Sequence, residues 1–207
     1  LSAREDEFVG VLEPGAWRHH GLGCLQRELT PTLRVHVWAP ELFRFSDDPH
    51  RPVHDHRFDL VSFVAAGEIV DVAYRVEQLY NHDSIDRLDR ARYTRAWHVK
   101  HAKVQTGIDV ELIGPVWVTE AERRILPAGT VYGIKRGRFH ATRIERPVCV
   151  TLVSRSRFGD EPARILGREM AWGGIVRDRD EDLYVEILSR AVGAIDDARR
   201  GWFLSEG

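Results

Sequence analysis

The stretch that decides the fold is Pro52-Val-His-Asp-His-Arg-Phe-Asp-Leu-Val-Ser-Phe-Val-Ala-Ala-Gly67. His54 and His56 stand two residues apart at the start of a long apolar run. In a β-strand this spacing directs both imidazoles to the same face of the sheet. Imidazole is a common ligand of divalent metals, so the pair forms one wall of a candidate metal site.

A third ligand has to come from another segment, because two ligands from one strand leave a metal ion under-coordinated. His140 is the candidate. It ends the segment Gly129-Thr-Val-Tyr-Gly-Ile-Lys-Arg-Gly137-Arg-Phe-His140, in which a glycine-containing turn precedes the histidine. The joint occurrence of this turn, His140 and the His-x-His pair predicts one metal site in a chain of β character.

Other histidines compete for these positions. The chain has 10 histidines, so a His-x-His pair also arises by chance at a protein surface. His98 and His101 are rival ligands, but their spacing of three places them on opposite faces of a strand. At most one of them can join His54 and His56.

Both histidine segments resemble the motifs of the cupin superfamily. Its first motif carries His-x-His followed by Gly, and its second has the form Gly-(x)5-Pro-x-Gly-x-x-His. Gly129, Gly137 and His140 fall on the second motif with its spacing, and Lys135 stands where Pro is usual. The resemblance implies a cupin-type double-stranded β-helix barrel with a metal ion inside.

The first motif departs from the family at one ligand. Cupins commonly place a Glu where this chain has Leu60, and Asp59 is the neighbouring residue. Alternation from His56 points Asp59 outward, unless a bulge turns it inward. We therefore expect three histidine ligands, with Asp59 as a fourth ligand or as the acceptor for an imidazole N–H.

The rest of the chain reads as a series of strands followed by a helix. Residues 17–28 mix polar and apolar side chains and predict a helix of weak periodicity. In residues 33–38 polar and apolar side chains alternate, which predicts a strand with Arg34, His36 and Trp38 on one face. This face either lines a pocket or forms the outer side of an edge strand. Further strands are predicted at 68–76, joined to the preceding strand at Gly67 as a hairpin, and at 93–104, 108–119 and 147–156. Residues 78–92 read as a loop.

We expect a single cupin domain over residues 1–207, with the barrel at about 31–157 and a helical extension at about 161–207. From Asp180 to Phe203 apolar residues recur with helical spacing. This helix is expected to pack on the outside of the barrel. Homodimer formation through its apolar stripe is left open.

Composition limits the partners. The chain has 30 basic and 32 acidic residues, so no net positive field attracts nucleic acid or an anionic membrane. Two distant cysteines, Cys24 and Cys149, do not indicate disulfides. Without a long apolar run or a signal peptide, we expect a cytoplasmic protein with a small-molecule substrate, no nucleic acid and no membrane partner.

Three neutral imidazoles suit several divalent metals, namely Fe(II), Zn, Ni, Mn and Cu. The resemblance favours Fe(II), because cupins with three histidines and no Glu often are oxygenases. The missing carboxylate leaves the metal charge uncompensated and favours an anionic substrate. Arg155 is the candidate counter-charge for it, with Arg34 and Arg143 as rivals. Tyr132 is a candidate hydrogen-bond donor to oxygen.

Thiol dioxygenases are one three-histidine class that this chain resembles. They share a Ser-x-His-x-Tyr run on the strand after the third ligand, and here the matching run is Thr151-Leu-Val153-Ser-Arg155. We therefore expect a wider function, a non-haem Fe(II) oxygenase acting on a small anionic organic molecule. The alternatives are a non-oxidative metal cupin, as isomerase, lyase or epimerase, and a cupin that binds a ligand without turnover.

Overall fold

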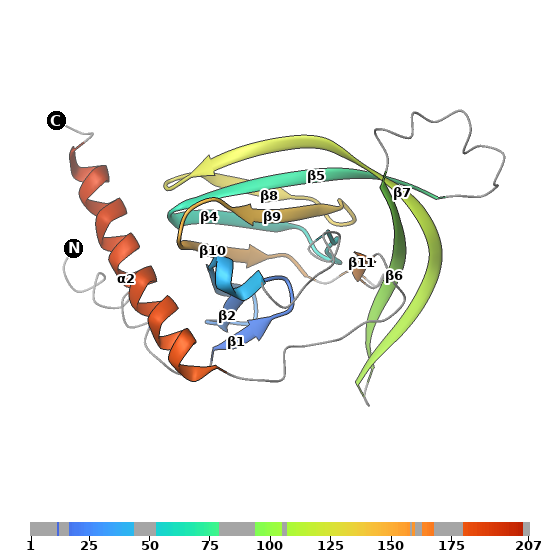
Figure 1. Ribbon diagram of the computed structural model, residues 1–207, viewed down its shortest axis with the longest axis horizontal. Coiled ribbons are helices and arrows are strands. Elements are labelled where there is room, and N and C mark those ends of the chain that lie inside the picture. The colour runs from blue at the N-terminus through green and yellow to red at the C-terminus, as the bar shows by residue number, and fades with distance from the viewer. Residues whose placement is uncertain are drawn as a thin grey trace.

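A computed structural model describes residues 12, 17–43, 53–78, 94–104, 107–157, 159, 163–167 and 180–204. Its described strands form two antiparallel sheets, with a helix along one side (Figure 1). The prediction of an all-β architecture of antiparallel sheets with a C-terminal helix is confirmed. The first sheet has the order β1(Arg18–His20), β2(Cys24–Glu28), β3(Leu33–Trp38), β10(Cys149–Arg155), β4(Leu60–Ala66), β8(Val131–Ile134), and the second β11(Ala163–Gly167), β6(Thr94–Val104), β7(Gly107–Pro127), β5(Glu68–Gln78), β9(His140–Ile144).

Gly67 connects the two sheets. The prediction of a β4–β5 hairpin is wrong, because β4 pairs with β10 and β8 whereas β5 pairs with β7 and β9. Gly67 has a φ of 76°, and a Cβ at this position would collide with the carbonyl oxygen of Val148. Glycine therefore allows the chain to leave one sheet and enter the other at a sharp corner.

The N-terminal segment also differs from its prediction. Residues 17–28 contain no helix, since β1 and β2 form an antiparallel hairpin around a turn with Gly23 at a φ of 91°. Pairing with β3 overrides the weak local periodicity. The barrel was expected at about residues 31–157. The sheets extend beyond these bounds, because β1 and β2 lie before residue 31 and β11 lies after residue 157.

The strands predicted at 93–104 and 108–119 are present as the antiparallel pair β6 and β7. β7 is longer than expected and continues past Pro115 to Pro127, with an irregular register opposite Gly114. The predicted loop at 78–92 lies, apart from Gln78 in β5, outside the described residues.

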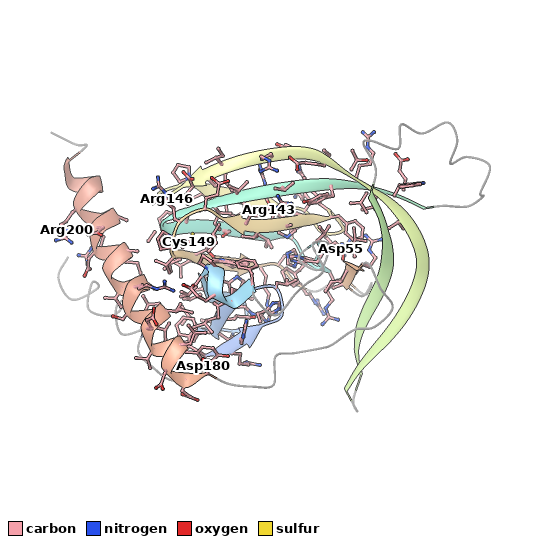
Figure 2. All side chains as sticks on the ribbon, in the orientation of Figure 1. Asp55, Arg143, Arg146, Cys149, Asp180 and Arg200 are labelled. Atoms are coloured by element: carbon pink, nitrogen blue, oxygen red, sulfur yellow. The ribbon has the colours of Figure 1, made fainter. Side chains whose placement is uncertain are left out.

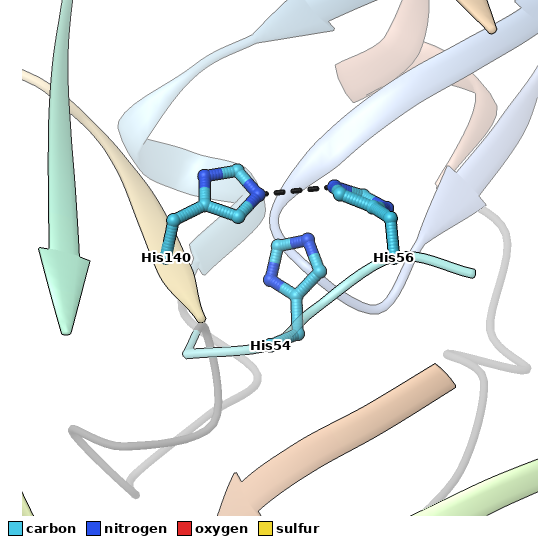
Figure 3. Close-up of side chains that lie close together, drawn as sticks. All are labelled: His54, His56 and His140. Carbon is cyan, nitrogen blue, oxygen red and sulfur yellow. Dashed lines mark hydrogen bonds between the residues drawn. The ribbon is translucent and has the colours of Figure 1, made fainter. Parts of the chain in front are cut away.

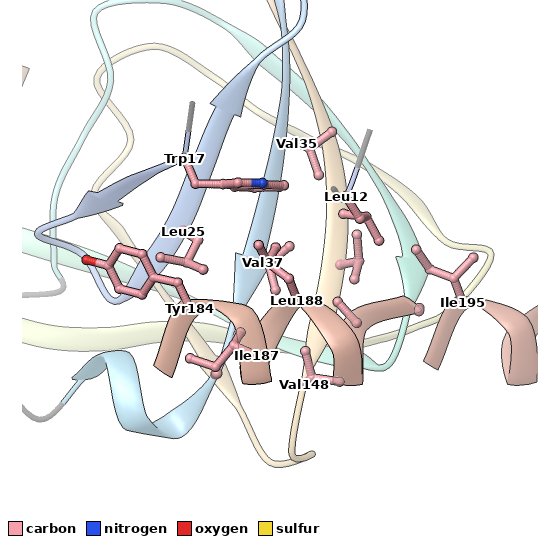
Figure 4. Close-up of a cluster of buried hydrophobic side chains, with 14 of the residues drawn as sticks. Leu12, Trp17, Leu25, Val35, Val37, Val148, Tyr184, Ile187, Leu188 and Ile195 are labelled. Carbon is pink, nitrogen blue, oxygen red and sulfur yellow. The ribbon is translucent and has the colours of Figure 1, made fainter. Parts of the chain in front are cut away.

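Helix α2(Glu181–Leu204) covers the outer face of the first sheet. Its Ile187, Leu188 and Ala191 are at most 4% exposed and pack against the outward residues of β3, including Val35 and Val37 (Figure 4). The predicted packing of this helix on the barrel is confirmed. At the helix start, Asp180 accepts a hydrogen bond from the backbone N–H of Leu183, as an N-cap residue does.

Besides the apolar cluster under α2, the protein has an interior between the inner faces of the two sheets, which is partly apolar and partly polar. At one end Cys24 and Cys149 are buried free thiols in an apolar cluster with Trp38 and Val64. The other end carries His54, Asp71 and further polar side chains, and Figure 2 shows Asp55 there, near β11 and far from α2. The described helix α2 lacks an apolar stretch long enough to cross a lipid bilayer.

Candidate metal centre

Three histidines from two distant segments converge between the sheets. Each offers a ring nitrogen, and these nitrogens of His54, His56 and His140 lie within 4.8 Å of one another. His54 and His140 are 6% and 4% exposed, and His56 is partly exposed. Figure 3 shows the three rings directed toward a common point. Among the described residues, this is the group of His, Cys, Asp and Glu side chains arranged to hold a metal ion.

Backbone hydrogen bonds fix the two segments to each other. The N–H of His54 donates to the carbonyl of His140 at 2.9 Å, and the N–H of His140 donates back at 2.8 Å. The carbonyl of His56 accepts from the N–H of Gly137, which has a φ of 76° in the turn between β8 and β9. The glycine of the second motif therefore anchors the ligand pair of the first.

Asp55, between the two ligands, anchors the segment on its other side. Its side chain is 3% exposed and accepts hydrogen bonds from the backbone N–H and the guanidinium of Arg164, both at 2.6 Å. The Asp55 N–H donates to the Arg164 carbonyl at 2.9 Å. Residues 54–56 lie outside the named strands, with His54 in isolated β-bridges to His140 and Ile165. The Asp55 side chain is bonded to Arg164, so it holds the backbone of this segment while the imidazoles of His54 and His56 join the histidine group.

Asp71 fixes the orientation and the tautomer of the His140 ring. Its Oδ1 lies 2.9 Å from His140 Nδ1, and both side chains are at most 5% exposed. An ionised carboxylate only accepts, so Nδ1 carries the proton and Nε2 presents its lone pair to the cluster. Burial alone would raise the pKa of Asp71, but hydrogen bonds from His140 and Arg124 lower it overall. Arg124 donates to Oδ2 at 2.5 Å.

The donor set fits a divalent transition metal. Burial, and then the nearby His54 and His140, hold the pKa of His56 well below 6.5, so its ring is neutral at neutral pH and has a lone pair to give. Nε2 of His56 and Nε2 of His140 lie 3.0 Å apart. Two imidazoles bound at right angles to an ion at about 2.1 Å have their nitrogens about 3.0 Å apart.

Asp59 is not in this group. Its side chain is 49% exposed, and its Oδ1 accepts the backbone N–H of Arg136 at 2.8 Å. Lys135, at the position where cupins carry Pro, lies 3.6 Å from the other oxygen. No bulge turns Asp59 inward, and Asp71 instead of Asp59 accepts the N–H of His140.

Sequence reasoning did not select Asp71. Its signal was nevertheless present, because Asp71 stands between Ile69 and Ala73 on one face of a predicted strand, where a carboxylate needs a partner. β5 pairs with β9 so that Ala73 is opposite His140. Asp71 is then the diagonal neighbour of His140, within reach of its ring.

Tyr132 lies on β8 and contacts the apolar group Leu60, Ile134 and Val153. Burial raises its pKa to about 12, so the phenol keeps its proton at neutral pH. The guanidinium carbon of Arg124 lies 5.8 Å from the centre of its ring. Its part in catalysis stays a prediction.

Arg155 is held at the edge of the same interior. Its Nε and Nη2 donate to the Pro31 carbonyl at 3.0 and 2.6 Å. Its guanidinium carbon lies 5.8 Å from the centre of the Phe58 ring, and that ring centre lies 5.0 Å from that of His56. Arg34 and Arg143 are the other candidates for the counter-charge of the substrate. Arg34 is on the inward face of β3. Arg143 is exposed on β9 and donates to the Tyr74 hydroxyl.

The rival ligands His98 and His101 lie on β6, and their side chains are outside the described residues. A surface cleft of about 370 Å³ adjoins the histidine group through Phe58, which forms part of its wall. Its other lining residues carry three cationic side chains and one carboxylate, namely Lys135, Arg136, Arg157 and Asp59, beside Ser156.

Comparison with known proteins gives limited information. No family model matches the chain, and no curated protein matches its sequence. Among solved structures, the chain is similar to hydroquinone 1,2-dioxygenase from Sphingomonas sp. TTNP3, determined with 4-hydroxybenzoate bound. The identity is 12%, over 72% of this chain and 70% of that chain, with a TM-score of 0.30. At this similarity we draw no functional conclusion from the match.

Proposed function

We propose that the protein holds one Fe(II) ion through His54, His56 and His140 and is a non-haem oxygenase acting on a small anionic organic molecule. The observation that supports it most is the convergence of three ring nitrogens within 4.8 Å, with the His140 lone pair directed inward by Asp71. Iron held by three histidines would supply open coordination positions where dioxygen and a chelating substrate react.

The charges around the site support an anionic substrate. Each buried carboxylate beside the histidines is already paired with an arginine, Asp71 with Arg124 and Asp55 with Arg164. Neutral imidazoles do not compensate the charge of a divalent ion. The metal-loaded site would therefore keep an excess of positive charge, which an anionic ligand balances.

The residues of the chain would position the reactants. Phe58 lines the surface cleft and lies next to His56, and the cationic side chains of the cleft would attract an anion. Leu60, Ile134 and Val153 make the neighbouring wall apolar and keep water from it. The pKa of about 12 leaves Tyr132 as a hydrogen-bond donor.

The test is metal analysis of protein purified without oxygen, followed by oxygen uptake with candidate organic acids. We expect one iron per chain in the native protein, and loss of most of it in His54→Ala, His56→Ala and His140→Ala. Metal content that survives two of these substitutions would overturn the ligand assignment. Bound iron without oxygen uptake on any acid would favour a non-oxidative metal-dependent enzyme.

Cysteine serves as a negative substrate in the same assay. In the run that thiol dioxygenases use beside the iron, Val153 occupies the position of the histidine and Arg155 that of the tyrosine. A valine side chain forms no hydrogen bond, so we expect slow oxygen uptake with cysteine. Rapid, stoichiometric uptake with cysteine would contradict this expectation.

A further inference from the structure

The inward face of the N-terminal strands carries polar groups that the metal centre does not use. Outward residues of β3 pack under α2, whereas Arg34 and His36 point between the sheets. β2 pairs with β3 so that Gln26 is opposite His36 and Glu28 is opposite Arg34. Together these four side chains form a polar wall in a protein whose other inward residues on β3 and β10 include Trp38 and Val153.

One atom of this wall has no partner. Nε2 of His36 is buried and forms no hydrogen bond with any described residue. Burial, then the nearby His20 and Arg34, lower the pKa of His36 to about 3, so the ring is neutral. A buried ring nitrogen without a partner is destabilising, and a bound molecule that hydrogen-bonds to it would remove this cost.

Arg34 is held in place beside it. With the Gln26 amide oxygen facing the guanidinium, that oxygen accepts from Nη1 at 2.8 Å and from Nε at 3.0 Å. Nη2 lies 3.4 Å from Glu28. A guanidinium has five N–H groups, and these contacts engage three of them. The Arg34 guanidinium is therefore held in one orientation before a ligand binds, and its remaining N–H groups can donate to that ligand.

Arg155 and Arg18, next to the wall, give its surroundings an excess of positive charge. Arg155 and Arg18 act on the Arg34 guanidinium and lower its pKa after burial does, whereas Glu28 opposes them. Glu28 lies 3.4 Å from Arg34 and 4.0 Å from Arg155, so one carboxylate serves two guanidiniums. Three cations and one carboxylate favour an anion.

The wall also lies near the histidine group. Glu28 of the wall lies 4.0 Å from Arg155. Contacts from Arg155 to Phe58 and from Phe58 to His56 join the two regions, with separations of 5.8 and 5.0 Å. The side chains of Arg155 and Phe58 therefore connect the wall to the histidine group.

We propose that Arg34 and His36 form a subsite for the carboxylate group of a small-molecule ligand whose other end lies at the three histidines. The guanidinium provides the planar pair of donors that matches a carboxylate, and the His36 ring supplies the N–H for its second oxygen. This inference rests on the proposed function and adds to it, since it replaces Arg155, already bonded to Pro31, as the main anchor of the substrate.

The test is calorimetric titration of the metal-loaded protein with benzoate and succinate, with benzamide as the neutral analogue of benzoate. We expect both carboxylates to bind and benzamide to bind at least tenfold more weakly. Arg34→Gln and His36→Gln should each weaken benzoate binding at least tenfold at unchanged metal content. Arg143→Gln, which removes an exposed arginine from the outer face of β9, should leave binding within twofold.

A measurement on the native protein avoids dependence on the variants. In ¹⁵N NMR spectra of the imidazole groups, benzoate should shift the His36 nitrogens and benzamide should not. Equal binding of benzoate and benzamide, or unchanged binding in both variants, would overturn the subsite. Phosphate that binds tighter than either carboxylate, with the same loss in Arg34→Gln, would overturn the choice of carboxylate.

These measurements distinguish failure of the proposed function from failure of the carboxylate subsite. A chain that takes up no metal overturns the three-histidine assignment, and benzoate binding to the metal-free protein then still tests Arg34 and His36. A chain that binds metal but no carboxylate leaves the metal centre intact and overturns the subsite alone.

Discussion

The two faces of the first sheet, built from the same strands, have opposite characters. On β3, Val35 and Val37 are fully buried under α2, whereas Arg34 and His36 alternate with them and face the interior. On β10, Val150 faces the helix and its neighbour Thr151 faces inward, where it accepts a hydrogen bond from Trp38. Successive residues therefore serve stability and chemistry separately, and substitutions on the two faces should have separable effects.

The largest expected effect on stability is on the helix face. Ile187→Ala should lower the free energy of unfolding by about 3 kcal/mol, because Ile187 is fully buried in the cluster under α2. Denaturant unfolding measures it, with Val185→Ala, at 49% exposure on the same helix, as the control. Metal content should not change in either variant. Loss of metal in Ile187→Ala would show that the two faces are coupled.

On the interior face, Asp71→Asn should weaken metal affinity about 10- to 100-fold, because it replaces the charged carboxylate that accepts from His140 by a neutral amide, which is a weaker acceptor and can also turn its NH2 group toward the ring. It also leaves Arg124 without its carboxylate partner, so a lower melting temperature should accompany the change. Competition with a chelator gives the affinity. An affinity within twofold of the native value would show that His140 is oriented by its backbone contacts alone.

The pH dependence of the free energy of unfolding tests the interior face of the first sheet, where His36 lies. The pKa of His36 is about 3 in the folded protein and 6.5 in a free side chain, so the unfolded chain binds more protons between these values. Stability should therefore fall as pH drops through this window, with a slope from this group of at most about 1.4 kcal/mol per pH unit. His36→Gln should reduce the slope between about pH 7 and pH 5, measured by denaturant unfolding. An identical slope would place a different group behind the dependence.

The smallest effect is expected at Asp59. Asp59→Asn should change metal affinity less than twofold, since this carboxylate is half-exposed and bonds to the Arg136 backbone. The comparison with Asp71→Asn in one chelator assay decides which carboxylate serves the site. A loss at Asp59 as large as that of a histidine would make it a ligand after all.

Much of this arrangement was predictable from short-range patterns. Alternation predicted that Asp59 points outward, and its side chain is 49% exposed. Helical spacing predicted the buried stripe of α2. The hairpin at Gly67 and the helix at residues 17–28 were wrong, because strand partners and not local sequence decide whether a corner or a hairpin forms.

The sequence by itself determined which side chains share a face and which histidines occur in motif spacing, since both depend on the two-residue period of a strand. Only the tertiary structure decided that Asp71 contacts His140, because this contact depends on the register between β5 and β9. It also decided that Arg34 and His36 are on the inward face of β3, because α2 packs on the opposite face. Pairing between strands far apart in the chain leaves no local signal, so residues that act together across the barrel are identified only when the sheets are assembled.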